Sequence, residues 1–173
     1  MGNIRKVLLW RSGFVLLLAL CVSSIYFCGC AARQKNVTNL PAGVTLAEVQ
    51  HWDSAVANLD KIAQTTSTAR KAVMDLNQQG LVAGEYYGKI LTTFGKIDQL
   101  QIDAVQFLKS QPKNWGASTQ AKVNNDLSLI QAELQNLTQQ QMVGIKSAGA
   151  QKQVGALITE IGDLAALILS TVG

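Results

Sequence analysis

Residues 147–169 read SAGAQKQVGALITEIGDLAALIL, and this stretch decides the fold. Its apolar residues recur in steps of three and four, the spacing that places side chains on one face of an α-helix. They are Ala150, Val154, Leu157, Ile161, Leu164 and Ile168. A second apolar row, formed by Ile158, Ala165 and Leu169, runs beside the first. A helix that is apolar over so much of its circumference is typical of a buried position, so we expect it to be the most buried helix.

The same spacing predicts a helix that begins at Thr45. Glu48 stands three residues later and completes a capping box, the sequence signature of a helix start. Gly80 is a natural stop for this helix. The hydroxyl-rich run Thr65-Thr66-Ser67-Thr68 is its weak point, because these side chains compete for the backbone and can bend a helix.

Two further helices lie between these. One runs from about Gly84 to Ser110 and ends before Pro112, because the residue before a proline avoids helical geometry. The other begins near Ser118 and ends at Gly144. Four amphipathic helices with short connections, and no segment with the alternating period of a strand, predict an all-α antiparallel four-helix bundle over residues 45–173.

Two glycine pairs interrupt these helices. Gly88 precedes Gly95 by seven residues, and Gly155 precedes Gly162 by the same interval. Seven residues are about two helical turns, so each pair lies on one stripe, and each glycine costs about 0.5–1 kcal/mol relative to alanine. Either a neighbouring helix approaches closely along the stripe, or the helix is loosely specified.

The amino-terminal segment points to a membrane. Residues 1–11 contain Arg5, Lys6 and Arg11 and no acidic residue, and residues 12–32 form a run of 21 residues without a charge. This pattern is typical of a secretory signal or of an uncleaved anchor, since about 20 apolar residues span a bilayer. In both cases the rest of the chain crosses the membrane, because the basic end stays in the cytoplasm.

The stretch Phe27-Cys28-Gly29-Cys30 ends this segment. It resembles the cleavage site of bacterial lipoproteins, in which an apolar residue and two small residues precede the lipidated cysteine. Phe27 stands where leucine is usual, and the resemblance covers residues 1–30 only. It implies that Cys30 carries the lipid. Because Ala31 rather than aspartate follows, it also implies the outer membrane if the host is Gram-negative.

The resulting division has three parts. Residues 1–29 are a signal peptide or membrane anchor, residues 30–44 are a linker, and residues 45–173 are the bundle domain. An uncleaved single-pass anchor and simple secretion remain as alternatives to lipidation.

Charge and cysteine content exclude several classes of function. The three cysteines lie at positions 21, 28 and 30, so a disulfide or a multi-cysteine metal site in the bundle is excluded. Removing residues 1–29 leaves 12 basic against 11 acidic residues. Such a nearly neutral domain lacks the clustered basic face that nucleic-acid binding needs. The expected partners are the membrane, through the amino terminus, and an unknown protein or other envelope component. Self-association through the last helix is a further expectation.

Catalysis finds little support in the sequence. His51 is the sole histidine, and helix spacing does not place Asp53, its candidate orienting partner, beside it. Asp103 is the other candidate partner. We interpret His51 as a boundary residue on a helix flank. The stretch from Gly84 to Lys89 is one residue short of the Walker pattern for nucleotide binding. Together with the single histidine, this leads us to expect no cofactor, no metal and no catalytic residue.

Three aromatic residues at the ends of helices are the candidate interaction surface: Trp115, Tyr86 and Tyr87. Each either closes an end of the bundle or marks a recognition surface. Glutamines are numerous, and we interpret them as a neutral solvent face; they are Gln64, Gln78, Gln79, Gln99, Gln101, Gln106, Gln131, Gln135, Gln139, Gln140 and Gln141.

These observations favour a non-catalytic, membrane-tethered envelope protein that acts as a binding module or a structural spacer. The alternatives are an uncleaved single-span membrane protein, a membrane-active protein that works through its last helix, and a small-ligand enzyme that uses His51.

Overall fold

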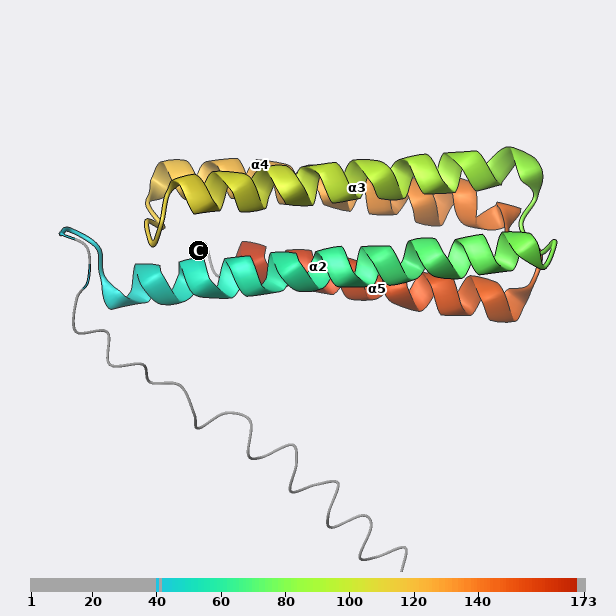
Figure 1. The fold of residues 1–173 in the computed structure, drawn as a ribbon, viewed down its shortest axis with the longest axis horizontal. Coiled ribbons are helices and arrows are strands. Elements are labelled where there is room, and N and C mark those ends of the chain that lie inside the picture. Colours follow the sequence, from blue (N-terminus) through green and yellow to red (C-terminus); the bar gives the residue numbers. More distant parts are fainter. Residues whose placement is uncertain (1–39, 41, 171–173) are drawn as a thin grey trace, which may run out of the picture. The chain divides into compact units, whose positions relative to one another are not determined.

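A computed structural model describes Leu40 and residues 42–170. The predicted signal or anchor, Cys30 and most of the linker lie outside the described residues. The described part forms four α-helices, which are α2 (Leu46–Gln78), α3 (Gly84–Ser110), α4 (Ala117–Asn136) and α5 (Ala148–Ser170). Successive helices run in opposite directions, which gives the predicted antiparallel helical bundle (Figure 1).

Both ends of α2 follow the sequence prediction. The hydroxyl of Thr45 accepts a hydrogen bond from the backbone N–H of Glu48 at 3.2 Å, and the Glu48 carboxylate accepts one from the backbone N–H of Thr45 at 2.7 Å. At the other end Gly80 has a φ of 70°, in the left-handed region that favours glycine. The N–H groups of Gly80 and of the next residue donate to the carbonyls of Asn77 and Leu76, so a Schellman motif ends the helix.

The hydroxyl-rich run does not interrupt α2, which is continuous from Leu46 to Gln78. The Thr66 hydroxyl donates to the carbonyl of Ile62 at 2.8 Å, one turn earlier. Thr68 makes the equivalent bond on the exposed side. Both hydroxyls therefore donate to a backbone carbonyl within the helix, which is how threonine is accommodated in a helix interior.

The carboxyl end of the third helix differs from the prediction. The α-helix ends at Asn136, and a π-helical turn (Leu137–Gln141) and a 3-10 turn (Met142–Gly144) follow. The Thr138 hydroxyl donates to the carbonyl of Leu134 at 2.9 Å. In an α-helix that carbonyl is the acceptor for the backbone N–H of Thr138, so the side chain competes with the α-helical bond at the place where the helix changes.

The π-helical turn also brings a polar side chain into the core. Gln141 is buried there and exchanges hydrogen bonds with Thr93 of α3, the shorter at 3.0 Å. Buried amides are stable only when they are hydrogen bonded in this way. The pair therefore fixes the position of the turn against α3.

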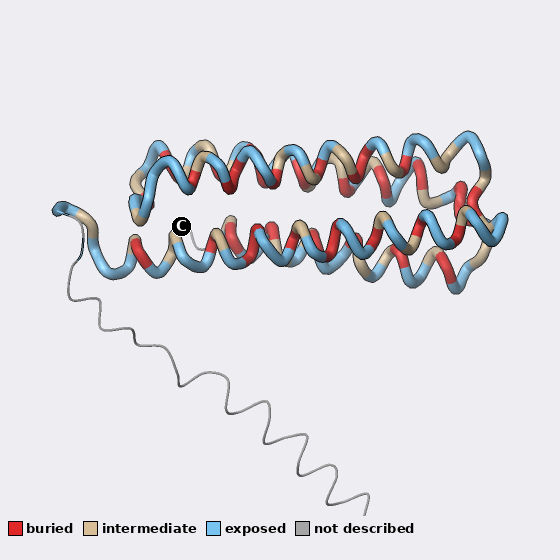
Figure 2. Tube along the Cα trace, viewed as in Figure 1, coloured by how far each residue is buried: buried red, intermediate tan, exposed pale blue. Residues whose placement is uncertain are grey.

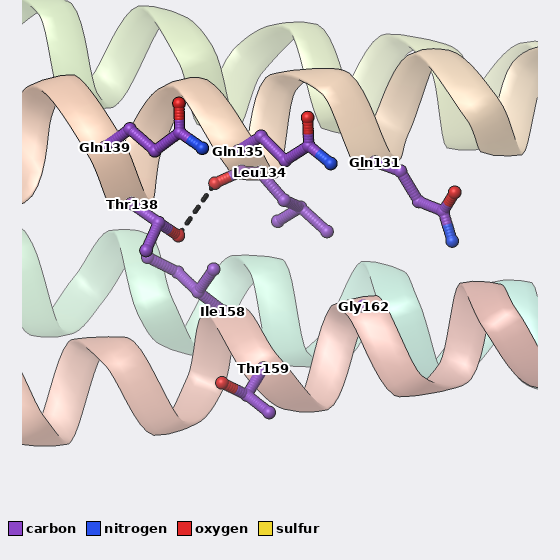
Figure 3. Close-up of a pocket in the computed structure, with 8 residues that line it drawn as sticks. All are labelled: Gln131, Leu134, Gln135, Thr138, Gln139, Ile158, Thr159 and Gly162. Atoms are coloured by element: carbon purple, nitrogen blue, oxygen red, sulfur yellow. Dashed lines mark hydrogen bonds between the residues drawn. The ribbon is translucent and has the colours of Figure 1, made fainter.

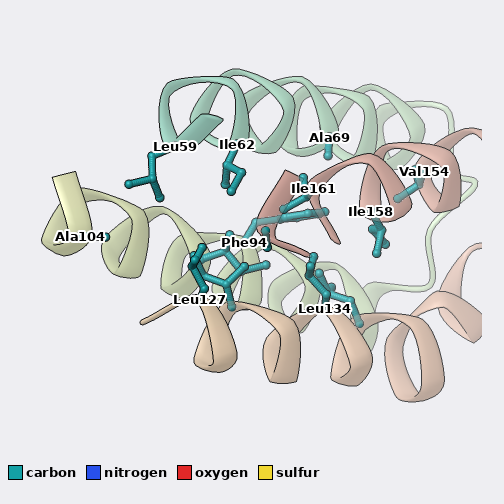
Figure 4. Close-up of a cluster of buried hydrophobic side chains, with 14 of the residues drawn as sticks. Leu59, Ile62, Ala69, Phe94, Ala104, Leu127, Leu134, Val154, Ile158 and Ile161 are labelled. Atoms are coloured by element: carbon teal, nitrogen blue, oxygen red, sulfur yellow. The ribbon is translucent and has the colours of Figure 1, made fainter. Parts of the chain in front are cut away.

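The core is formed by one face of each helix (Figure 2). Leu59, Phe94, Leu127 and Ile161 come from α2, α3, α4 and α5 in turn, and each is fully buried. Figure 4 shows side chains from all four helices in this cluster. The periodic rows in the sequence therefore meet in one shared core, which is the main source of stability in a chain of this kind.

The expectation that α5 is the most buried helix is wrong. Six of its 23 residues are buried, against ten of the 33 residues of α2. Ile158 and Ala165 of the second apolar row are buried, whereas Leu169 is only partly covered. The physical reason is that α5 packs mainly against α2 and α4, which leaves its outer side exposed, including half of Leu167.

Candidate functional site

His51 lies in the first turns of α2 and is partly exposed. No hydrogen bond joins its imidazole to another described residue. Asp53 pairs with Lys113, and Asp103 accepts a hydrogen bond from Gln99 at 2.8 Å. The structure therefore does not bring His51 together with either candidate orienting carboxylate.

A small cluster next to His51 connects α2 to the end of α3. The indole N–H of Trp52 donates to the carbonyl of Leu108 at 3.1 Å. The ammonium of Lys113 lies 4.6 Å from the centre of the Trp52 ring and pairs with Asp53. Such a cation–π contact with an ion pair joins two helix ends, so the part played by Trp52 here is structural.

Trp115 closes the same end of the bundle. It is 2% exposed and belongs to the core cluster. Its carbonyl accepts a hydrogen bond from Gln120 at 2.9 Å, whereas its indole N–H has no partner among the described residues. The structure thus places Trp115 inside the bundle rather than on a surface that a partner can reach.

Tyr86 and Tyr87 lie at the opposite end, and both are partly buried against the core. Tyr86 lies directly on Gly144, where an added Cβ would come within 2.3 Å of the tyrosine. The Lys89 ammonium lies 5.3 Å from the centre of the Tyr86 ring. Beside them Val143 is 65% exposed, so this end does present apolar surface to solvent.

Backbone pairing joins the two connections at this end. Val82 and Ile145 form an isolated antiparallel β-bridge. The N–H of Ala83 donates to the carbonyl of Gly144, and the N–H of Lys146 donates to the carbonyl of Leu81, each at 2.8 Å. Hydrogen bonds therefore join the α2–α3 and α4–α5 connections at one end of the bundle, which we call the far end. The end that holds the start of α2 is the near end.

Two acidic residues in the described part interact with groups of their own helix or its cap. The pKa of the Glu48 carboxyl is lowered because it accepts hydrogen bonds from the backbone and the side chain of Thr45. Asp126 is buried and pairs with Lys122, one turn earlier, at 2.5 Å. Among residues 42–170 there is no group of three or more histidine, cysteine or acidic residues that could hold a metal ion.

A groove between α4 and α5 is the feature that sequence reasoning missed. It has a volume of about 390 Å³. We call it the amide groove, and its lining residues are Gln131, Leu134, Gln135, Thr138, Gln139, Ile158, Thr159 and Gly162. Figure 3 shows the three glutamines in a row above the residues from α5. The spacing of these glutamines at intervals of four was the available signal, because residues four apart lie on one helical stripe.

Comparisons of the chain with protein-family models, with curated proteins and with solved structures found no match.

Proposed function

We propose that this chain is a non-catalytic, membrane-tethered protein of the cell envelope, anchored through Cys30, whose bundle binds an envelope partner or acts as a spacer. The observation that carries the proposal is the basic start, the uncharged run of 21 residues and the lipoprotein-like Phe27-Cys28-Gly29-Cys30 that follows. An outer-membrane location in a Gram-negative host follows from Ala31 under the same resemblance.

The geometry of the bundle supports this proposal. Helix α2 starts at the near end, with its cap residue Thr45 only 15 residues after Cys30 (from 30 to 45). Helix α2 has 33 residues, and at 1.5 Å per residue it is about 50 Å long. Tyr86, Tyr87 and Val143, at the far end, therefore lie about that distance from the start of α2, where a tether would join the bundle.

Mass spectrometry of the membrane-extracted protein tests the anchor. We expect a chain that begins at Cys30 and carries added acyl mass, and we expect Cys30→Ala to abolish both the cleavage and the added mass. Detection of intact residues 1–32 in the mature protein would establish the uncleaved anchor instead. Loss of the protein from the membrane fraction without any acyl mass would indicate simple secretion.

A membrane-active role is the second candidate, and one observation favours it. Of the helices in the described part, α5 alone is long and apolar enough to cross a bilayer. Its core face, centred on Ile161, is however buried within the bundle, so insertion would require the bundle to open. Release of a trapped dye from liposomes by the purified protein is the test, and release at low protein concentration would favour this role over that of a spacer.

The enzyme alternative has a simple test. Replacing His51 by alanine should leave the function of a binding module or spacer unchanged. A phenotype equal to that of a deletion of the whole chain would favour a role for His51 in catalysis.

A further inference from the structure

Uncharged hydrogen-bonding groups form one wall of the amide groove. Gln131, Gln135 and Gln139 project along it, and none of their side-chain amides makes a hydrogen bond with another described residue. Each glutamine amide carries an acceptor oxygen and two N–H donors. Thr159 adds a hydroxyl from α5. A ligand that binds here must therefore offer both donors and acceptors in return.

The spacing of the glutamines matches one kind of ligand. Four residues of α-helix rise about 6 Å, which is the separation of Gln131 from Gln135. Gln139 follows four residues later, in the π-helical turn. In an extended peptide, residues whose N–H and C=O face the same edge repeat every two residues, or about 6.6–6.8 Å. Gln131 and Gln135 can thus meet the N–H and C=O groups of two alternate peptide residues, and Gln139 continues the row. The mismatch of less than about 1 Å between the two spacings can be taken up by rotation about the glutamine side-chain bonds.

The floor of the groove limits the side chains of such a peptide. Leu134 and Ile158 form it and are each 5% exposed, while Gly162 contributes no side chain. No charged residue lines the groove, so a charged ligand side chain would lose its water without gaining a partner. No aromatic ring lines it either, and a sugar ring therefore lacks a surface on which to stack.

We propose that the amide groove binds a short, uncharged segment of extended peptide through its main chain. The partner would be a protein that exposes such a segment, in a terminal tail or at the edge of a β-sheet. The recognition resembles the addition of a strand to a sheet edge, with side-chain amides in place of backbone groups. This inference rests on the binding role proposed above, for which it names the class of partner.

Side-chain amide resonances in the NMR spectrum of the full chain in detergent micelles provide the test. The probe is a heptapeptide of alternating serine and valine, blocked at both ends. We expect it to shift the amide signals of Gln131, Gln135 and Gln139 and to leave that of Gln106, on α3, in place. Substitution of each glutamine by alanine assigns the signals.

Two matched comparisons make the test specific. Gln135→Ala should weaken peptide binding about two- to tenfold, the effect of losing one or two hydrogen bonds, whereas Gln106→Ala should not change it. Both residues are exposed, so neither variant should perturb folding. The same peptide with methyl groups on alternate backbone nitrogens, which removes those N–H donors, should not shift the signals.

Several results would overturn the proposal. One is an equal loss of peptide affinity in Gln135→Ala and Gln106→Ala. Another is that the N-methylated peptide binds as tightly as the unmodified one. A third is that a neutral chitin oligosaccharide shifts the glutamine signals and the peptide does not. None of these depends on Cys30. If the chain is lipidated but the amide groove does not bind the peptide, only this inference is overturned. If the groove binds the peptide but the chain is not lipidated, only the proposed membrane tether is overturned.

Discussion

The two flanks of α5 differ in how they meet their neighbours. Toward α4 the flank carries Gly155 and Gly162, and an alanine Cβ at Gly162 would lie 3.8 Å from Leu134, an ordinary contact. By helical spacing Leu157 and Leu164 lie on the opposite flank, toward α2, and both pack against the core. The periodicity of the two flanks is the same. The difference lies in the size of the side chains: leucines fill the interface of α5 with α2, whereas Gly162 leaves a groove between α5 and α4.

The largest expected effect concerns the face that both flanks share. Ile161 is fully buried, so Ile161→Ala should lower the free energy of unfolding by about 2–5 kcal/mol, through lost burial and the cavity left behind. Urea melts measure it. Gln140→Ala, at an exposed position, is the control and should stay within about 0.5 kcal/mol. If Ile161→Ala leaves the free energy of unfolding unchanged, this face of α5 is exposed in the monomer and is not packed between α2 and α4.

Leu164→Ala tests the filled flank. Because Leu164 is only partly buried, we expect a loss of about 1–2 kcal/mol, less than full burial of a leucine provides. The same urea melts apply. An effect close to zero would show that the α2 side of the helix is as open as the α4 side.

Thr45→Ala changes the bundle away from both flanks. Loss of this cap should cost about 1 kcal/mol at neutral pH, and it should add to the effect of Leu164→Ala because the sites are independent. The folded-state pKa of Glu48 lies below its ordinary value of 4.5, so its contribution is present above that value and is lost as the pH falls through the folded pKa. The two proteins should therefore differ less under acid conditions than at neutral pH. If the difference in unfolding free energy between the two proteins does not change with pH, the Glu48 carboxylate does not contribute to the stability of the cap.

Gly162→Ala should have the smallest effect and the opposite sign. Because the added Cβ meets only an ordinary contact, we expect the helix to gain about 0.5–1 kcal/mol from the better helix former. Gly88→Ala is the matched control, since no atom lies within 4 Å of its Cβ position. Equal gains in thermal melts would exclude close helix approach at Gly162. A loss at Gly162 alone would show that α4 needs the glycine.

Local signals in the sequence were sufficient for the helices and most of their ends. Thr45 with Glu48, Gly80 and Pro112 each act through bonds or sterics within a few residues, so they can be interpreted without the fold. The π-helical turn could not be predicted, because it depends on Thr138 competing for a carbonyl and on Gln141 meeting Thr93, which lies 48 residues away along the chain.

The place of Trp115 and the existence of the amide groove could likewise not be predicted from local sequence signals. A tryptophan in a loop is compatible with either a plug or a recognition surface, and only the packing at the near end places Trp115 inside. The abundance of uncharged glutamines predicts a neutral solvent face. That Gln131, Gln135 and Gln139 line a groove depends on which helix lies opposite them, and that information is not local.

The antiparallel order of the helices has a mechanical consequence. Because four helices alternate in direction, the start of α2 and the last turn of α5 lie toward the same end of the bundle (Figure 1). A pulling force applied between these two points would separate α2 from α5 turn by turn, beginning at that end. Opening of this kind breaks few contacts at a time, whereas a load between opposite ends would shear the whole interface at once. The bundle would therefore resist tension across its length better than tension between the start of α2 and the last turn of α5.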